Sequence, residues 1–243
     1  MKTQWYARGL LIGGLGLVFA LPLPAAELSG ETAAAGLKDA LQVGTGRAVD
    51  LLGRLDGYLG NPDVRIPIPD KLEKVGKTVR KLGLDDLVDE FETSMNRAAE
   101  AAAPLAKDVF VETIKGMSFS DALAIVRGEG HEATDYLREN AGPKLGEQFL
   151  PIVQEQLGAV GATQAFDRLM QRYSEIPFVS KPAVDLDAYV TEEALDGLFL
   201  MIAKEEEKIR KDPLARTTDL LKQVFGAVVD KDKKVPWWKK LGK

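Results

Sequence analysis

The chain has 243 residues, of which 45% are apolar, 37 are acidic, 32 are basic, one is histidine and none is cysteine. Without cysteine there is no disulfide framework, thiolate metal site or cysteine nucleophile, and the single histidine, His131, excludes a two-histidine metal site. A formal net charge of −5 argues against a dedicated nucleic-acid-binding protein, so we expect no nucleic-acid partner.

Residues 1–26 have the pattern of a secretory signal peptide. Lys2 and Arg8 form a basic start, residues 9–21 are uncharged and mostly apolar, and small residues end the segment. As a helix, residues 9–21 would span about 20 Å, short of the ~30 Å hydrocarbon core, which favours a cleaved signal over an anchor. We therefore expect a periplasmic protein with no transmembrane helix after cleavage. It is not expected to be a lipoprotein, because lipid attachment needs a cysteine.

Almost all of residues 27–226 has the apolar periodicity of helices, which predicts a single all-α domain of about nine helices. The segment 85–115 has the most regular seam, with apolar residues, Leu105 among them, spaced alternately by three and four. Pro104 is expected to kink or divide this helix, and Gly83 is expected to end the helix before it. The apolar face of the helix expected at 36–55 extends to Leu55, and Ser118 is expected to cap the helix that it opens. The nine helices are expected at 36–55, 70–82, 85–115, 118–127, 131–140, 143–158, 162–173, 187–211 and from 217 or 218 to 225.

Two stretches differ from the helical pattern. Residues 57–69 contain a turn signal at Asn61-Pro62 and prolines at 67 and 69, which predicts one short extended arm. Residues 227–243 are dense in lysine, which predicts a flexible basic tail. Within this tail, Trp237 and Trp238 are candidates for a weak contact with anionic membrane surfaces.

Five short motifs together resemble a bacterial family known as domain of unknown function 4197. The similarity extends over roughly residues 36–226. It implies an exported, all-helical protein of Gram-negative bacteria, and it brings no assigned activity or site residues. The motifs are DGYLGNPD at 56–63, IPIP at 66–69, SMNRAAE at 94–100, ALDGLF at 194–199 and RTTDLL at 216–221.

The polar face of the 85–115 helix holds the first candidate binding residues, Asn96, Arg97 and Glu100. One interpretation is an intrahelical ion pair on an exposed stripe. The other is a polar cluster buried against the 57–69 arm or lining a groove, which the presence of asparagine inside a helix favours.

The turn-rich segment 56–63 holds the other candidates, Asp56, Asn61 and Asp63. Their oxygens are of the type that binds Ca²⁺, but their spacing does not match a twelve-residue calcium loop, so turn formation is the better interpretation. We expect no metal and no cofactor, and we assign no catalytic residue.

Two further motifs favour structural roles. Gly76-Lys77-Thr78 matches the end of a phosphate-binding loop, but it lies inside a predicted helix, where the backbone N–H groups are already used. Within Glu205-Glu206-Glu207, the last two residues are spaced for ordinary ion pairs with Arg210 and Lys211, which predicts a solvated face.

The best functional interpretation is a non-catalytic exported helical protein that binds a partner protein or small ligand in the periplasm. One alternative is a cofactor-free hydrolase that uses two carboxylates on cell-envelope glycans. Another is a structural homo-oligomer. A cleft holding two carboxyl groups, one with a raised pKa, favours the hydrolase, whereas an exposed apolar groove favours binding.

Overall fold

The computed structural model describes residues 30–128, 130–215, 218, 219 and 222, and within them the chain forms helices and no strand. The predicted all-α class is confirmed. The α-helices are α1 (Gly30–Leu52), α2 (Asp70–Lys81), α3 (Asp85–Ala102), α4 (Ala106–Gly116), α5 (Phe119–Arg127), α6 (Glu132–Ala159), α7 (Ala162–Ser174) and α8 (Leu186–Lys211). Two short 3-10 helices are η1 (Ala103–Leu105) and η2 (Pro213–Ala215).

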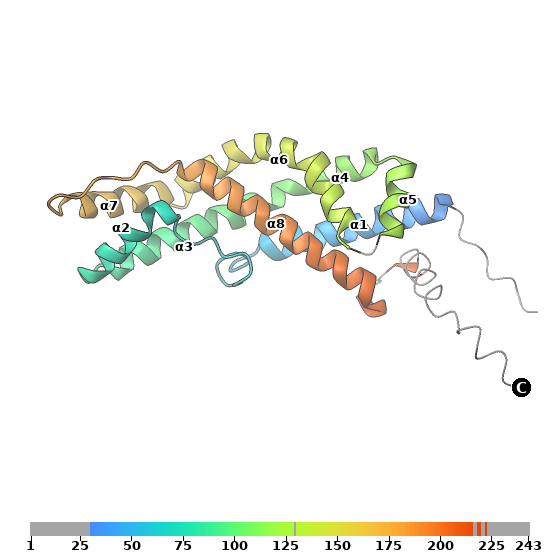
Figure 1. The fold of residues 1–243 in the computed structure, drawn as a ribbon, viewed down its shortest axis with the longest axis horizontal. Coiled ribbons are helices and arrows are strands. Elements are labelled where there is room, and N and C mark those ends of the chain that lie inside the picture. The colour runs from blue at the N-terminus through green and yellow to red at the C-terminus, as the bar shows by residue number, and fades with distance from the viewer. Residues whose placement is uncertain (1–29, 129, 216–217, 220–221, 223–243) are drawn as a thin grey trace, which may run out of the picture.

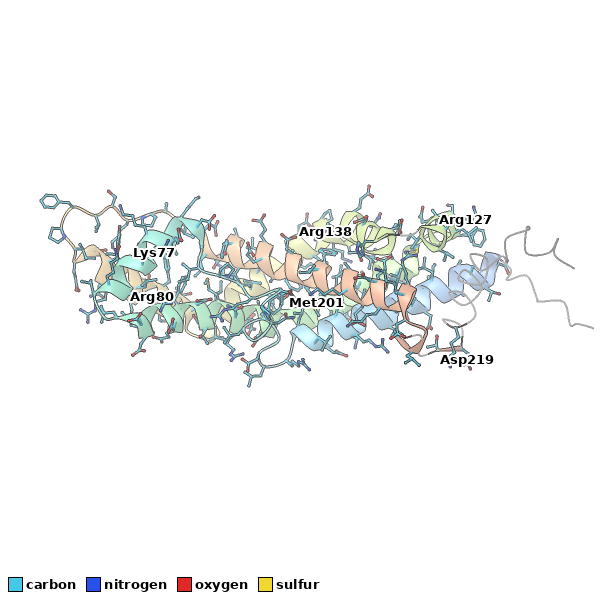
Figure 2. The ribbon with its side chains drawn as sticks, turned by 60° about the horizontal axis from the view of Figure 1, so that its bottom comes forward. Lys77, Arg80, Arg127, Arg138, Met201 and Asp219 are labelled. Carbon is cyan, nitrogen blue, oxygen red and sulfur yellow. The ribbon has the colours of Figure 1, made fainter. Side chains whose placement is uncertain are left out.

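The helices form an elongated bundle (Figure 1). Helix α8 packs mainly against α6 and α1, and α3 packs mainly against α6 and α7. The α2–α3 turn and the α7–α8 connection lie at one end, whereas the start of α1, α5 and the end of α8 lie at the other (Figure 1). Figure 2 shows the same two ends of the bundle, with Lys77 and Arg80 near one end and Arg127 and Asp219 near the other.

Several helix ends follow from local sequence. Gly83, in the left-handed conformation with φ +76°, follows the end of α2, as predicted. Ser118 accepts a hydrogen bond from the backbone N–H of Asp121 at 3.1 Å and so caps α5. Asp185 caps α8 by accepting from the N–H of Ala188 at 3.0 Å. These side chains satisfy backbone donors that a helix leaves without an internal partner.

Pro104 divides the long predicted helix into α3, η1 and α4. The seam residues of α3 are buried, but Leu105, which the heptad pattern assigned to the same seam, is half exposed. A 3-10 turn has three residues per turn instead of 3.6, so the turn at 103–105 shifts the seam out of phase. Leu55 is a second such correction, because α1 ends at Leu52 and leaves it 73% exposed.

The predicted helix count is slightly wrong, since 131–140 and 143–158 form the single helix α6. Pro143 and Pro151 lie inside α6. A proline inside a helix removes one backbone hydrogen bond. A buried stripe at intervals of four residues continues across both prolines, and its packing offsets that loss. The stripe consists of Ala141, Leu145, Phe149, Val153 and Leu157.

Three predictions concern other parts of the chain. The signal peptide at 1–26, the basic tail at 227–243 and most of the last predicted helix lie outside the described residues. In the part of the chain that the structure describes, no helix is both long and apolar enough to cross a membrane.

Candidate functional site

Asn96 on α3 holds the arm in place through both atoms of its amide. Its Oδ1 accepts from the backbone N–H of Ile66 at 2.9 Å, and its Nδ2 donates to the carbonyl oxygen of Ile66 at 2.8 Å. The Nδ2 group also donates to the carbonyl of Glu92 at 2.8 Å. Asn96 is fully buried. Its amide therefore pairs with an arm residue much as a neighbouring β-strand would.

Glu100, one turn further along α3, binds the start of the arm. Its Oε1 accepts from the backbone N–H groups of Tyr58 and Leu59, both at 3.1 Å. Its Oε2 accepts from Arg97 at 2.6 Å, and Arg97 also donates to Asp56 at 2.8 Å. The hydrogen bond to Glu100, together with that to Asp56, raises the pKa of the Arg97 guanidinium. This carboxylate is thus neutralised by a cation and by two backbone donors although it is buried.

Tyr58 joins the arm to α8. Its hydroxyl donates to the carbonyl oxygen of Ala194 at 2.7 Å, and burial, with the charge of Glu100, raises the pKa of this phenol. A Cβ placed on Gly197 would lie 2.8 Å from the Tyr58 ring and 3.3 Å from Cβ of Val64. Only glycine fits this close approach without a shift. The arm, α3 and α8 therefore meet around Tyr58.

The structure thus chooses between the two interpretations of the polar face of α3. Asn96 and Glu100 are buried against the arm and Arg97 is mostly covered, so the exposed-stripe interpretation is wrong. Their polar atoms hold the chain's own backbone. A role of these three residues in ligand binding stays a prediction.

Asp56, Asn61 and Asp63 each contact a different group. Asp56 pairs with Arg97, Asp63 pairs with Lys204 on α8, and Asn61 Oδ1 accepts from the N–H of Asp63 at 3.1 Å. Asp56 also adopts a left-handed conformation with φ +64°. These contacts are those of a folded turn. Among the described residues, no cluster of His, Cys, Asp or Glu has the arrangement needed to hold a metal ion.

Glu206 and Glu207 form the predicted ion pairs with Arg210 and Lys211, but the predicted solvated face is wrong for Glu205 and Glu206. Glu205 and Glu206 are buried, whereas Glu207 is exposed and pairs with Lys211. Glu206 accepts from the backbone N–H groups of Ala133 and Thr134, at 3.1 and 2.9 Å. This carboxylate from α8 therefore caps α6, a tertiary contact that the i,i+4 spacing could not indicate.

Glu206 and Arg210 together form what we call the second buried cluster, the first being that of Asn96, Arg97 and Glu100. Arg210 donates to Glu206 at 2.7 Å and to the carbonyl oxygens of Gly128 and Ile125, at 2.8 and 3.1 Å. The end of α8 is thereby tied to the α5–α6 connection. These ionised groups are satisfied by each other and by the backbone, which indicates a structural role.

Two hollows in the described part of the chain differ in kind. A cavity of about 20 Å³ between α1 and α8 has room for about one water molecule. A larger, open groove of about 360 Å³ runs along the last turns of α1. It is lined by Arg47, Asp50, Leu51, Arg54 and Glu205.

Two exposed leucines lie beside the contact between the end of α1 and η1. A Cβ placed on Gly53 would lie 2.8 Å from Cγ of Pro104, so the end of α1 abuts η1. Leu55 lies two residues after Gly53 and is 73% exposed. Leu105 directly follows Pro104 and is half exposed. The groove residues, together with Leu55, Pro104 and Leu105, form a surface that we call the docking surface. Sequence reasoning missed it because it assigned both leucines to the core.

A carboxylate with a raised pKa lies elsewhere, on α8. Partial burial, followed by the charges of Asp196, Glu192 and Asp70, raises the pKa of Glu193. Glu193 lines neither of the two described hollows. Glu193 thus has the raised pKa that the hydrolase alternative requires of one carboxyl group, but it lies outside these two hollows.

Comparisons with known proteins identify a family and no activity. The model of a family described as "Protein of unknown function (DUF4197)" matches residues 27–226, which is most of the chain. No curated protein and no solved structure matches the chain.

Proposed function

We propose that this chain, which belongs to the DUF4197 family, is a non-catalytic helical protein of the periplasm that binds a partner protein through the docking surface. One observation carries the proposal. Leu55 is 73% exposed although the chain on both sides of it is held, by the contact of Gly53 with Pro104 and by the ion pair of Asp56 with Arg97. Together with the half-exposed Leu105, Leu55 supplies the apolar part of the docking surface; grouped exposed apolar side chains mark interaction sites, and a segment already held in place loses little freedom on binding.

The charges around the groove describe the partner. Arg47 on α1 and the exposed Arg54, two residues after the end of α1, line the groove together with the half-buried Leu51 and the exposed Asp50. Glu205 lies at the groove but already binds Lys208 at 2.5 Å and Arg47 at 3.7 Å. The partner is therefore expected to present an apolar side chain for Leu55 and Leu51 and a carboxylate for Arg54. Arginine and buried apolar anchors carry much of the energy of protein interfaces.

Site-specific photo-crosslinking in the periplasm tests this proposal. A photoreactive phenylalanine at position 55 is expected to capture one envelope protein. The same residue at position 200, where Leu200 on α8 is also exposed, is the matched control and should not capture it. Adding Leu105→Asp or Arg54→Glu should abolish the adduct, and Leu200→Asp should leave it unchanged. Equal capture at both positions would contradict the proposal.

The same adducts distinguish the homo-oligomer. An adduct with twice the mass of the chain, sensitive to Leu105→Asp, would make the docking surface an interface between copies. With the captured partner in purified form, Arg54→Glu is expected to weaken affinity by about tenfold or more, the effect of a residue that contributes substantially to an interface.

Export is tested separately. Intact-mass measurement of the protein isolated from periplasmic extract is expected to show a chain that begins at Ala26 or Glu27. Retention of Met1, or recovery only from the cytoplasm, would contradict the periplasmic location.

The raised pKa of Glu193 is the one observation that favours the alternative of a hydrolase for envelope glycans. In that case purified protein should release soluble sugars from cell-wall material, and Glu193→Gln should abolish the release. The conservative Glu192→Gln on the exposed neighbouring position is the control.

A further inference from the structure

Phe178, in the connection between α7 and α8, has an unusual position for an aromatic residue. Its side chain is completely exposed, at 107% of the reference area, and its backbone is left-handed, with φ +64°. This conformation is disfavoured for a bulky residue, because its Cβ comes too close to the following carbonyl oxygen. Such strain persists only where the surrounding structure imposes it, and it is found disproportionately at functional sites.

The residues around Phe178 hold this loop in place. Ile176 and Val179 are partly buried and pack against the core. The backbone N–H of Ile176 donates to the carbonyl of Tyr173 at 3.2 Å, which continues the last turn of α7. The ring is therefore displayed by an anchored loop, so little backbone freedom remains to be lost when a partner buries it.

A second apolar side chain is exposed at the same end of the bundle. Leu82 lies in the α2–α3 turn and is 57% exposed. This turn and the α7–α8 connection are both at the end farthest from the start of α1 (Figure 1). Each apolar residue has an exposed lysine nearby in sequence, Lys81 beside Leu82 and Lys181 three residues after Phe178. Across the α2–α3 turn, Arg80 on α2 pairs with Asp85 and Asp89 on α3.

We propose that this end of the molecule binds a phospholipid surface, with Phe178 and Leu82 inserted at the interface and Lys81 and Lys181 at the phosphate groups. The two apolar side chains project from separate turns, and neither of the described hollows lies between them. A lipid interface deforms around two separate protrusions, whereas a protein pocket must match their shape. Lysines with long apolar stems fit the boundary between acyl chains and headgroups.

The absence of cysteine from the sequence allows a label at a single position. Ser180→Cys, carrying an environment-sensitive fluorophore, reports on the tip, and Ser120→Cys at the start of α5 reports on the opposite end. Both serines are exposed. Vesicles of phosphatidylethanolamine and phosphatidylglycerol are then added to the full chain. We expect a blue shift of the fluorophore at position 180 and none at position 120.

Substitutions in the labelled protein identify the inserted side chains. Phe178→Ser is expected to lower the apparent vesicle affinity by about tenfold or more, since the apolar area of one aromatic ring is no longer transferred. Phe119→Ser, at a half-exposed phenylalanine of the opposite end, is the matched control and should leave the affinity unchanged. Lys81→Glu with Lys181→Glu should weaken binding on these vesicles more than on vesicles with phosphatidylcholine in place of phosphatidylglycerol.

Three results would overturn the proposal. The first is no shift at position 180, and the second is a Phe178→Ser affinity equal to that of the parent protein. The third is an unshifted label together with capture of an envelope protein by a photoreactive residue at position 178, which would assign the tip to a protein partner. Thermal melts of the variants should match the parent, because both side chains are exposed. This proposal does not depend on the docking surface.

Discussion

The ring of Tyr58 lies against Gly197, at a distance where a Cβ on residue 197 would be 2.8 Å from the ring edge. The two residues are far apart in sequence and are held together by the hydrogen bond from the Tyr58 hydroxyl to the Ala194 carbonyl. This contact places the arm between α3 and α8. Leu55 and Asp56 directly precede the arm, so the position of Leu55 on the docking surface depends on how the arm is held.

Replacing Gly197 with alanine should therefore destabilise the protein. Overpacking a filled site costs about 1–3 kcal/mol, which exceeds the gain of roughly 1 kcal/mol or less from replacing glycine inside a helix. Gly146→Ala on α6 is the matched control, because nothing lies within 4 Å of the added Cβ. Denaturant unfolding should show a lower midpoint for Gly197→Ala and an equal or higher one for Gly146→Ala. A midpoint above that of the parent for Gly197→Ala would contradict the tight contact.

Loss of the Asn96 amide should cost more than loss of a surface asparagine. Asn96→Ala leaves the buried N–H and C=O of Ile66 without their partner, with an expected cost of about 2–4 kcal/mol. Asn140 on α6 also donates to a carbonyl four residues earlier, but it is exposed. Asn140→Ala is expected to change stability by less than about 0.5 kcal/mol. Similar unfolding midpoints for the two variants would show that the hydrogen bonds between Asn96 and the arm do not stabilise the fold.

Glu206 and Glu207 provide an adjacent pair with opposite surroundings. Glu206→Ala removes the cap of α6 and leaves Arg210 without its buried carboxylate, with an expected loss of about 3 kcal/mol. Glu207→Ala removes an exposed pair with Lys211, worth about 0.5 kcal/mol or less. Chemical denaturation followed by circular dichroism measures both. If the two losses are equal, the second buried cluster does not stabilise the fold.

The raised pKa of Glu193 gives a dependence of stability on pH with a defined sign. A carboxyl group whose pKa is higher in the folded state binds more protons when folded, so its contribution falls as pH rises from its ordinary value of 4.5 through the folded pKa. Glu193→Gln removes the charge near Asp196, Glu192 and Asp70. It is therefore expected to raise the melting temperature at pH 7 and to have a much smaller effect well below pH 4.5.

Thermal melts of Glu193→Gln and the parent protein over this pH range test the sign. A parent protein that is more stable than the variant at pH 7 would show that the ionised form of Glu193 is favoured in the folded state. Glu207→Gln serves as the opposite case, because the hydrogen bond from Lys211 lowers the pKa of Glu207.

The candidate site could be predicted only in part. The polar stripe of Asn96, Arg97 and Glu100 is visible as residue types at helical spacing, because one helix fixes which residues share a face. The arm was one of the predicted partners, but the groups on it that bind the stripe were not visible, since the N–H groups of Tyr58 and Ile66 are backbone groups, which every residue carries. The same reason explains Glu206, whose spacing to Arg210 is local but whose cap of α6 joins segments far apart in the sequence.

The features that depend on near neighbours could be predicted from the sequence. They are the helical class from apolar periodicity, the end of α2 before Gly83, the cap of α5 at Ser118 and the break at Pro104. Propensity, capping and proline sterics act over a few residues, so they can be read in order along the chain. Other features depend on tertiary packing and became visible only in the structure. Glu205 and Glu206 are buried, α6 continues through two prolines, and Leu55 and Leu105 are exposed. Burial depends on which surfaces meet, and a change of phase of one short turn at residues 103–105 is enough to move a leucine from the core to the surface.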